Sequence, residues 1–239
     1  MSQGRDLHHF ELPGGGRAIF TTKRAGNLSL AAGVGHEQGL HVREQLCDEL
    51  GLQWLCAGPQ VHGTIVRRVM TREQRGGTPV REQADGHATA LSRVGVMVLA
   101  ADCVPVVLGT QGAVAAVHAG WRGLAAGVLE EGVSALRELS SGGEVQAVIG
   151  PCAGACCYEV GAEVLQSFTT DLRALGEPLS TQSEKAKLDL RQLARHRLLT
   201  AGVEQVDDLE ICTICDEGMF SHRREGQDAG RQAAVAWLP

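Results

Sequence analysis

The sequence contains few aromatic residues and no long uninterrupted apolar run. Phe, Trp and Tyr make up 3% of its 239 residues, so the core must be built from Val, Leu, Ile and Ala. No uncharged apolar stretch reaches about eighteen residues, the length expected of a membrane span. Residues 1–15 lack the apolar centre of a signal peptide. These absences predict a cytoplasmic protein with a globular core.

The sequence also has no excess of basic over acidic residues. The net charge of -6 argues against a general nucleic-acid or membrane surface, because both favour a basic face. We therefore expect small metabolites as partners, and a monomer or a small homo-oligomer. The eight cysteines are unevenly spaced and several lie in apolar runs. This distribution favours reduced thiols over a disulfide framework.

The order of apolar patterns predicts an α/β fold in a single domain spanning residues 1–239. Three β-rich runs with short turns between them predict adjacent strands covered on both faces, at 94–103, 104–109 and 113–120. Further strands are expected at 144–150, 207–215 and 231–238, and helices at 124–141, 158–175 and 188–202. The Gly- and Arg-rich stretch at 71–87 predicts a surface excursion.

Three short segments place a metal-binding side chain beside a turn at the end of an apolar run. They are QVHG, ADCVP and HAGWRG, which contain His62, Cys103 and His118. Strand ends are where α/β proteins gather active groups. Two imidazoles and a thiolate suit Zn²⁺, and three protein ligands leave a fourth position for water or substrate. We therefore take His62, Cys103 and His118 as candidate ligands of one metal ion.

The spacing alone leaves other interpretations open. Cys103 could be a small buried hydrophobic residue, His62 a loop residue and His118 a satisfied core histidine. The pairs Cys156-Cys157 and Cys212-Cys215 allow a zinc ribbon. We discount that possibility, because adjacent cysteines chelate one ion poorly and CTIC lies in a strand-like run. We expect structural thiols at these four positions.

Other polar residues near these segments are candidates for substrate binding. Arg122 follows a Gly-flanked turn that opens a helix, where an anion is favoured, although it could equally be a solvated charge. Asp102 could orient a ligand histidine, accept a proton or cap a turn. A Gly-rich turn near the C-terminus carries four basic residues that could contact substrate, or could form a solvated basic turn: His222, Arg223, Arg224 and Arg231.

Taken together, the motifs resemble those of the YfiH/laccase-domain family. The resemblance rests on QVHG, ADGHAT, ADCVP, HAGWRG, GPCAGACCYEVG and the C-terminal CT, FSHRR and GRQAAV segments, and it runs from about Phe20 to the C-terminus. It implies a layered α/β sandwich of the CNF1/YfiH-like type with a mixed sheet. It also implies Zn²⁺ bound by His62, Cys103 and His118, with Cu²⁺ as the alternative.

Members of this family have been called polyphenol oxidases, peptidoglycan editing factors and purine nucleoside phosphorylases. The resemblance implies phosphorolysis of adenosine, inosine and S-methyl-5'-thioadenosine, together with adenosine deamination. On this basis we expect Cys103, His118 and Asp102 to be catalytic, with Asp102 supporting proton transfer. Arg122 is expected to bind phosphate, and Arg24 is the candidate counterpart of a family arginine near the N-terminus.

The sequence departs from the family pattern in its substrate-binding segments. The N-terminal segment FTTKRAGNLSLAAGVGHEQG is compressed, Ala194 replaces a usual asparagine, and His222 replaces a usual tyrosine. Three alternatives stay open at this stage. They are a copper-dependent polyphenol oxidase, a metal-free hydrolase with Cys103 as nucleophile and His118 as base that edits peptidoglycan precursors, and a non-catalytic metabolite-binding protein.

Overall fold

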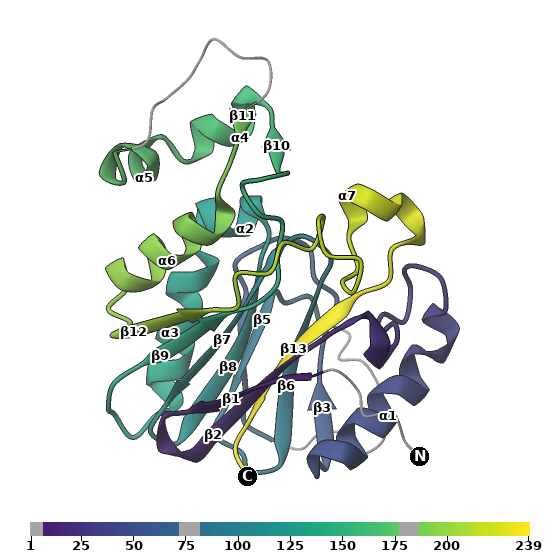
Figure 1. Ribbon diagram of the computed structural model, residues 1–239. Coiled ribbons are helices and arrows are strands. Elements are labelled where there is room, and N and C mark those ends of the chain that lie inside the picture. The colour runs from purple at the N-terminus through teal and green to yellow at the C-terminus, as the bar shows by residue number, and fades with distance from the viewer. Residues whose placement is uncertain (1–6, 72–81, 177–185) are drawn as a thin grey trace.

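The computed structural model describes residues 7–71, 82–176 and 186–239, and two mixed β-sheets form its centre (Figure 1). The first sheet has five strands, in the order β1 (Leu7–Leu12), β2 (Gly16–Thr21), β13 (Gln232–Trp237), β6 (Val94–Ala100) and β3 (Trp54–Cys56). The second has six strands, in the order β12 (Gln205–Asp208), β9 (Gln146–Ile149), β7 (Val104–Thr110), β8 (Ala113–Ala119), β5 (Gly86–Thr89) and β4 (Val66–Val69).

The core consists of small aliphatic side chains arranged in layers. Phe20, Val96 and Ala234 of the first sheet pack against Val107 and Val148 of the second, which makes the two sheets a sandwich. The outer face of the first sheet packs against α1 (Gly39–Leu50). The outer face of the second sheet is covered by α3 (Val128–Leu139) and α6 (Leu190–Thr200). The predicted α/β sandwich with mixed sheets is therefore confirmed.

The helices begin and end where local chemistry allows. The predicted helix at 124–141 is divided into α2 (Trp121–Ala126) and α3, because Gly127 between them has φ 98°, a left-handed conformation that glycine adopts at low cost. The side chain of Asp189 accepts a hydrogen bond from Gln192 N at 2.9 Å and so caps the start of α6. The remaining helices are α4 (Ala162–Ser167), α5 (Thr169–Ala174) and α7 (His222–Glu225).

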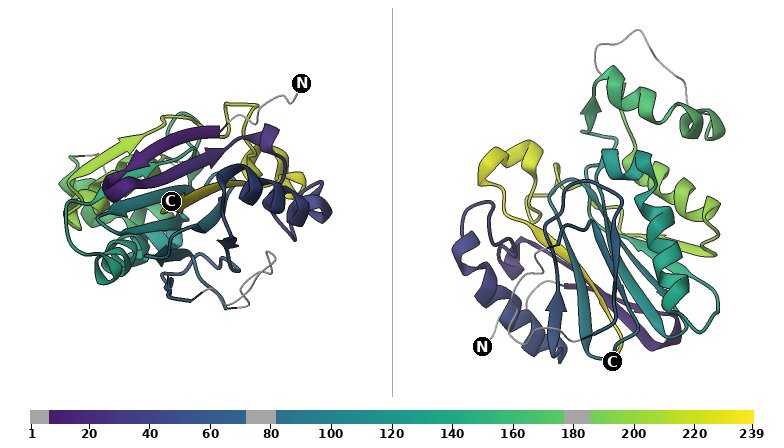
Figure 2. Two further views of the ribbon diagram at one scale, coloured as in Figure 1. Left: turned by 90° about the horizontal axis from the view of Figure 1, so that it is seen from below. Right: turned by 180° about the vertical axis from the view of Figure 1, so that it is seen from behind.

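A small group of elements extends beyond one end of the sandwich. The two-stranded sheet of β10 (Glu159–Val160) and β11 (Ala186–Lys187) lies there with α4 and α5, as the view from behind in Figure 2 shows. Short 3-10 turns occur at Pro13–Gly15, Lys23–Ala25, His36–Gln38 and Gly226–Asp228. Within the described residues, no helix is both long enough and apolar enough to cross a bilayer.

Four sequence-based expectations need correction. The segment 158–175 is not one helix, because it contains β10 followed by the two short helices α4 and α5. The run at 94–103 does not pair with 104–109, because β6 joins the first sheet while β7 and β8 form a hairpin in the second. The strand predicted at 207–215 ends at Asp208, and Cys212–Cys215 form a turn. The surface excursion predicted at 71–87 lies partly outside the described residues, and its last residues are buried at the start of β5.

Candidate active site

The three predicted metal ligands come from three separate segments and meet at one end of the sandwich. His62 lies in the loop between β3 and β4, Cys103 in the turn before β7, and His118 near the end of β8. The antiparallel register pairs His118 with Pro105, which brings Cys103 to the same edge. Their potential ligand atoms all lie within 4.8 Å of one another, and Cys103 Sγ is 3.7 Å from His62 Nε2. The prediction from the motif settings, that these three side chains belong to one site, is consistent with this geometry.

A buried carboxylate that the sequence analysis did not single out organises this cluster. Asp85 is fully buried, and its Oδ1 lies 2.9 Å from His118 Nδ1. The same carboxylate accepts backbone N–H groups from Val61, His62 and Gly63 at 2.8–3.2 Å. Burial opposes ionisation of Asp85, yet the hydrogen bonds from His118 and the backbone keep its pKa below the ordinary value. Asp85 therefore fixes both histidines.

The donor set fits a catalytic metal ion. With Asp85 ionised, His118 donates its Nδ1 proton to that carboxylate, so its Nε2 is left as the ligand atom. His62 adopts φ 61°, a strained left-handed conformation that places its ring at 4.9 Å from the His118 ring. A Cβ at Gly120 would lie 2.4 Å from His62 Cδ2, so only glycine permits this approach. Two imidazoles and one thiolate leave one position open on a tetrahedral ion.

Cys103 and His118 influence each other strongly. Burial favours the neutral thiol, but the neighbouring His118 and His62 lower the pKa of Cys103 to about 6. Burial also disfavours protonated His118, whereas Cys103 and Asp85 raise its pKa to about 9. Without a metal ion the two groups would form a thiolate–imidazolium pair. The thiolate form of Cys103 is the form that a metal ion requires.

The cluster opens into a cavity of about 640 Å³. Its lining includes all three candidate ligands together with polar and charged side chains from both ends of the sequence, namely Ser29, Arg43, Gln60, His222 and Arg231. Gln60 is fixed because its side-chain amide makes two 2.7 Å hydrogen bonds to the backbone of Leu99. The volume lies in the range of pockets that enclose small ligands.

Two arginines line this cavity. Arg231 is half-buried, and burial lowers its pKa while the charges of Cys103 and Asp102 act in the opposite direction. Arg43 is buried, with Nε donating to the Leu28 carbonyl at 2.8 Å, and burial lowers its pKa to about 10. Guanidinium groups bind phosphate or carboxylate through paired hydrogen bonds. The cavity therefore combines a potential metal-binding cluster with two arginine residues in its lining.

The arginines predicted from sequence lie elsewhere. Arg122 is exposed, and its guanidinium lies 4.3 Å from the centre of the Trp121 ring. Arg122 is not among the residues that line the cavity. It is the second residue of α2, a helix of six residues. Arg24 lines a different cavity of about 520 Å³. The arginine that the sequence analysis assigned only to a basic C-terminal turn, Arg231, is the one beside the cluster.

Asp102 lies next to Cys103, but its carboxylate is engaged with the protein. Its Oδ1 accepts Thr213 Oγ1 at 2.7 Å and its Oδ2 accepts the backbone N–H of Arg223 at 2.6 Å. Its backbone has φ 93°, a conformation rare outside glycine. Asp102 therefore connects the Cys103 turn to the two C-terminal loops. The carboxylate that orients a candidate ligand histidine, His118, is Asp85.

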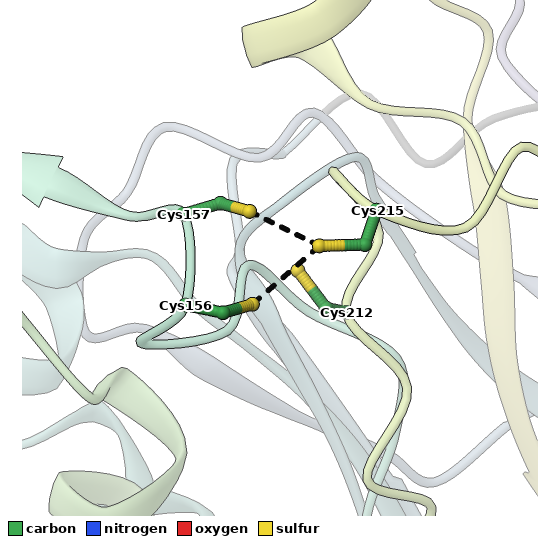
Figure 3. Close-up of side chains that lie close together, drawn as sticks. All are labelled: Cys156, Cys157, Cys212 and Cys215. Atoms are coloured by element: carbon green, nitrogen blue, oxygen red, sulfur yellow. Dashed lines mark hydrogen bonds between the residues drawn. The ribbon is translucent and has the colours of Figure 1, made fainter.

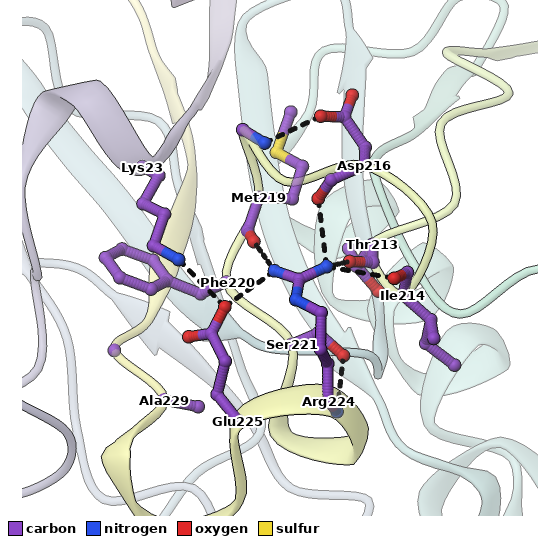
Figure 4. Close-up of polar contacts among 12 residues, drawn as sticks. Lys23, Thr213, Ile214, Asp216, Met219, Phe220, Ser221, Arg224, Glu225 and Ala229 are labelled. Atoms are coloured by element: carbon purple, nitrogen blue, oxygen red, sulfur yellow. Dashed lines mark hydrogen bonds and ion pairs between the residues drawn. The ribbon is translucent and has the colours of Figure 1, made fainter.

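The other basic residues of the C-terminal turn stabilise loops. The guanidinium of Arg224 donates to the carbonyls of Thr213, Ile214, Asp216 and Met219 (Figure 4). Glu225 accepts from Arg224 at 2.6 Å and from Lys23 at 2.8 Å, which joins this turn to the N-terminal region. Arg223 lies over the Tyr158 ring and donates to the Glu159 carbonyl at 3.1 Å. Of the four basic residues, His222 and Arg231 line the cavity.

Comparisons with known proteins agree on one family. The model of the family described as multi-copper polyphenol oxidoreductase laccase matches residues 16–239. A purine nucleoside phosphorylase of Xylella fastidiosa is 39% identical over 95% of this chain and 88% of that protein. A purine nucleoside phosphorylase of Corynebacterium glutamicum is 34% identical over 93% of this chain and 94% of that protein.

A solved structure gives the same result for the fold. The crystal structure of YlmD from Geobacillus stearothermophilus superposes with a TM-score of 0.80 at 31% identity, covering 94% of this chain and 92% of that one. The crystal structure of the YfiH protein of Bacillus licheniformis has a TM-score of 0.80 at 28% identity, over 94% and 93%. The chain therefore belongs to the YfiH/laccase-domain family.

Proposed function

We propose that this chain is a zinc-dependent purine nucleoside phosphorylase in which residues 1–239 form one catalytic domain. The observation that carries the proposal is the cluster of His62, Cys103 and His118 in the wall of a cavity that two arginines also line. Relatives 34–39% identical over nearly the whole chain are named purine nucleoside phosphorylases. As substrates we propose adenosine, inosine and S-methyl-5'-thioadenosine.

Zinc is favoured over copper by the ligands available. Among the described residues, the group of His62, Cys103 and His118 is the one potential metal-binding group that contains histidine. A multi-copper oxidase couples several copper ions and needs many more histidines than this group supplies. A single ion with three ligands and one open position matches hydrolytic and transfer chemistry. Stoichiometric copper with matching phenol oxidation would contradict this choice.

Phosphorolysis requires a phosphate oxygen to attack the sugar carbon C1' while the bond from C1' to the purine breaks. When bound, zinc supplies a Lewis acid that stabilises negative charge at the open position. Arg231 and Arg43 hold the phosphate beside the sugar with the guanidinium N–H groups that do not donate to backbone carbonyls, because both residues line the same cavity. His222 would act as the general acid from its imidazolium form. Its Nδ1–H lies 2.8 Å from the Gly226 carbonyl, which leaves the Nε2–H of the imidazolium to protonate the departing base, and neutral His222 remains.

The other predicted site residues take supporting positions. Asp102 acts on proton transfer indirectly, because its carboxylate accepts the backbone N–H of Arg223 and so helps to fix the neighbouring His222, which lines the cavity. Arg122 is exposed in α2, the helix that follows His118, and we assign it to guiding phosphate towards the cavity rather than to binding it there. Arg24 faces a separate cavity and has no part in the proposed transfer.

Adenosine deamination is the second reaction that we propose for this cavity. In this reaction a water molecule replaces phosphate as the nucleophile. The purine ring, and not the sugar carbon, must then lie next to the His62, Cys103 and His118 cluster. Cys103 and His118, as ligands fixed by the sheet edge and by Asp85, serve both reactions. The unpaired state of all eight cysteines supports a reducing cytoplasm, where the Cys103 thiolate stays available.

Incubation of metal-analysed protein with adenosine, inosine and S-methyl-5'-thioadenosine, with and without phosphate, tests the proposal. We expect free base and sugar 1-phosphate only when phosphate is present. Ammonia release from adenosine without phosphate would report deamination separately. Base release that ignores phosphate would indicate a nucleoside hydrolase and would overturn the proposal.

A second candidate rests on the thiolate–imidazolium pair of Cys103 and His118. That pair is the arrangement of a Cys–His hydrolase, which could act on peptidoglycan precursors. A thiol reagent distinguishes the two functions. A metal-ligated Cys103 is protected until a chelator is added, whereas a nucleophilic Cys103 is labelled in the untreated protein.

A further inference from the structure

Four of the other seven cysteines, from the loops that follow β9 and β12, meet at a second place on the molecule. Cys156 and Cys157 lie in the loop after β9, and Cys212 and Cys215 lie in the loop after β12 (Figure 3). Their Sγ atoms all lie within 4.8 Å of one another. Cys215 Sγ is 3.5 Å from Cys156 Sγ and 3.0 Å from Cys157 Sγ. From the sequence we discounted a zinc ribbon at these positions and expected structural thiols, whereas the structure brings the four sulfurs together.

We propose that Cys156, Cys157, Cys212 and Cys215 bind a structural zinc ion through four thiolates, independently of the His62 site. Zn–S bonds of about 2.3 Å in a tetrahedron place the sulfurs about 3.8 Å apart. The observed separations therefore require sulfur movements of about 1 Å or less. Four thiolates suit zinc among the abundant divalent ions, and a complete set of four ligands is typical of a structural site.

The turn that carries Cys212 and Cys215 has the form that tetrathiolate sites use. The backbone N–H groups of Gly154, at 3.2 Å, and of Cys215 both hydrogen-bond to Cys212 Sγ. Such hydrogen bonds stabilise a thiolate whose charge is shared with a metal ion. The backbone of Asp216 donates to the Cys212 carbonyl at 3.0 Å, which closes the CTIC turn. CTIC is therefore a metal-binding knuckle and not part of a strand.

The adjacent pair is able to share one ion because its loop is also tightly turned. The backbone N–H groups of Cys157 and Tyr158 both donate to the Gly154 carbonyl at 3.0 Å. In Figure 3 the Cys156 and Cys157 side chains both point towards Cys215. A Cβ at Gly154 would lie 3.1–3.3 Å from Cys212 and from Cys156 Sγ, so glycine permits this close approach of the two loops.

The surroundings offset the charge of a zinc tetrathiolate, which is negative by about two units. Lys187 Nζ donates to the Cys156 carbonyl at 2.7 Å, and Arg224 donates to carbonyls of the CTIC turn. Backbone hydrogen bonds of Cys152 with Ile211 and Thr213 already align the loops. Sulfur is a weak hydrogen-bond partner, so thiols alone would hold four largely accessible sulfurs together poorly. A metal ion bound by all four sulfur atoms would hold them together.

The proposed ion would also affect the candidate active site, because Thr213 follows the ligand Cys212 directly in the chain. Thr213, between Cys212 and Cys215, donates its hydroxyl to Asp102 beside Cys103. A zinc ion that fixes this turn thus fixes the position of Asp102. The two metal sites are separate in their ligands but linked through this hydrogen bond.

Metal analysis of the full-length chain, purified under reducing conditions without added metal, tests the proposal. We expect about two zinc ions per chain in the wild type. C215S should retain one, H62A should retain the other, and C47S, which alters a cysteine of α1 outside both groups, should retain two. Circular dichroism confirms that each variant is folded. One zinc per wild-type chain that C215S leaves unchanged would overturn the proposal.

Cobalt gives an independent readout. In H62A stripped of metal and reloaded with Co²⁺, we expect one cobalt per chain with the intense sulfur-to-metal absorption of a tetrathiolate, and its loss in H62A/C215S. Iron in place of zinc, in wild type but not in C215S, would overturn the choice of zinc. A disulfide between Cys157 and Cys215 in the freshly purified reduced protein would overturn the metal site itself.

Discussion

The two thiol-containing clusters of this molecule differ in ligand number and in surroundings. The group of His62, Cys103 and His118 offers three ligands in the wall of a 640 Å³ cavity. The four cysteines of the C-terminal loops offer a complete set close to the surface, with backbone N–H groups as their support. An incomplete set beside a cavity leaves a position for substrate, and a complete set does not. The first cluster is therefore suited to catalysis and the second to holding loops.

The largest expected effect comes from Cys103→Ser. We call the group of His62, Cys103 and His118 the open site and the four-cysteine group the closed site. Loss of the Cys103 thiolate should remove zinc from the open site, and the transition state then loses several kcal/mol of charge stabilisation. Because about 1.4 kcal/mol is a factor of ten, we expect kcat/KM for inosine in phosphate to fall by about a thousandfold. Steady-state assays with C47S as the matched cysteine control measure this. Activity within tenfold of wild type, despite loss of the metal ion, would contradict a catalytic role for the His62, Cys103 and His118 group.

Asp85→Asn should weaken zinc binding at the His62, Cys103 and His118 group and leave the four-cysteine group unchanged. The variant removes the charge that orients His118, so zinc affinity at the open site should fall by about 10- to 100-fold. The four-cysteine site should keep its affinity. Competition with a chromophoric chelator resolves the two sites, and Asp189→Asn, which keeps the cap of α6, is the control. Equal weakening of both sites would mean that Asp85 acts only on overall stability.

Cys215→Ser tests the structural role of the closed site. Losing the ion that joins the two loops should lower the free energy of unfolding by about 2 kcal/mol. For a chain of this size that corresponds to a fall in Tm of about 4–8 °C. Thermal unfolding followed by circular dichroism measures it, with C47S as the control. An unchanged Tm would show that the closed site does not stabilise the fold.

Arg231→Gln distinguishes the cavity arginine from the exposed one. A hydrogen bond to a charged group contributes about 1.5–3 kcal/mol, so we expect the KM for phosphate to rise at least tenfold. Arg122→Gln should change it by less than about threefold, because screening weakens an exposed charge. Initial rates at varied phosphate concentration give both values. The reverse order would restore Arg122 as the phosphate ligand.

Gly154→Ala is the mildest change. Its Cβ contacts of 3.1–3.3 Å require the two cysteine loops to move apart slightly. We expect a loss of about 1 kcal/mol, or a fall in Tm of about 2–4 °C, with zinc retained at the open site. Metal analysis combined with thermal unfolding reports both. Loss of zinc from the open site instead would indicate that the loops and the cavity are a single unit.

The sequence predicts those parts of this molecule that depend on local patterns. Apolar runs located β7 and β8, and the motif settings of His62, Cys103 and His118 singled out three side chains that the structure brings together. The pairing of β6 with β13 was not predictable, because a buried strand shows no preference for one sheet over another.

The unpredicted site residues depend on long-range contacts. Asp85 stood within the ADGHAT motif, but its role depends on hydrogen bonds to residues more than twenty positions away. Arg231 resembled any solvated basic residue until β13 placed it beside the cavity. The cysteine pairs are separated by more than fifty residues, so their spacing could not show that the loops meet.

The most direct test of the central claim is base release from inosine by zinc-loaded protein, measured with and without phosphate in wild type and in C103S. We expect hypoxanthine together with ribose 1-phosphate in wild type only when phosphate is present, and almost none in C103S. Equal hypoxanthine release without phosphate, or undiminished release by C103S, would contradict the central claim.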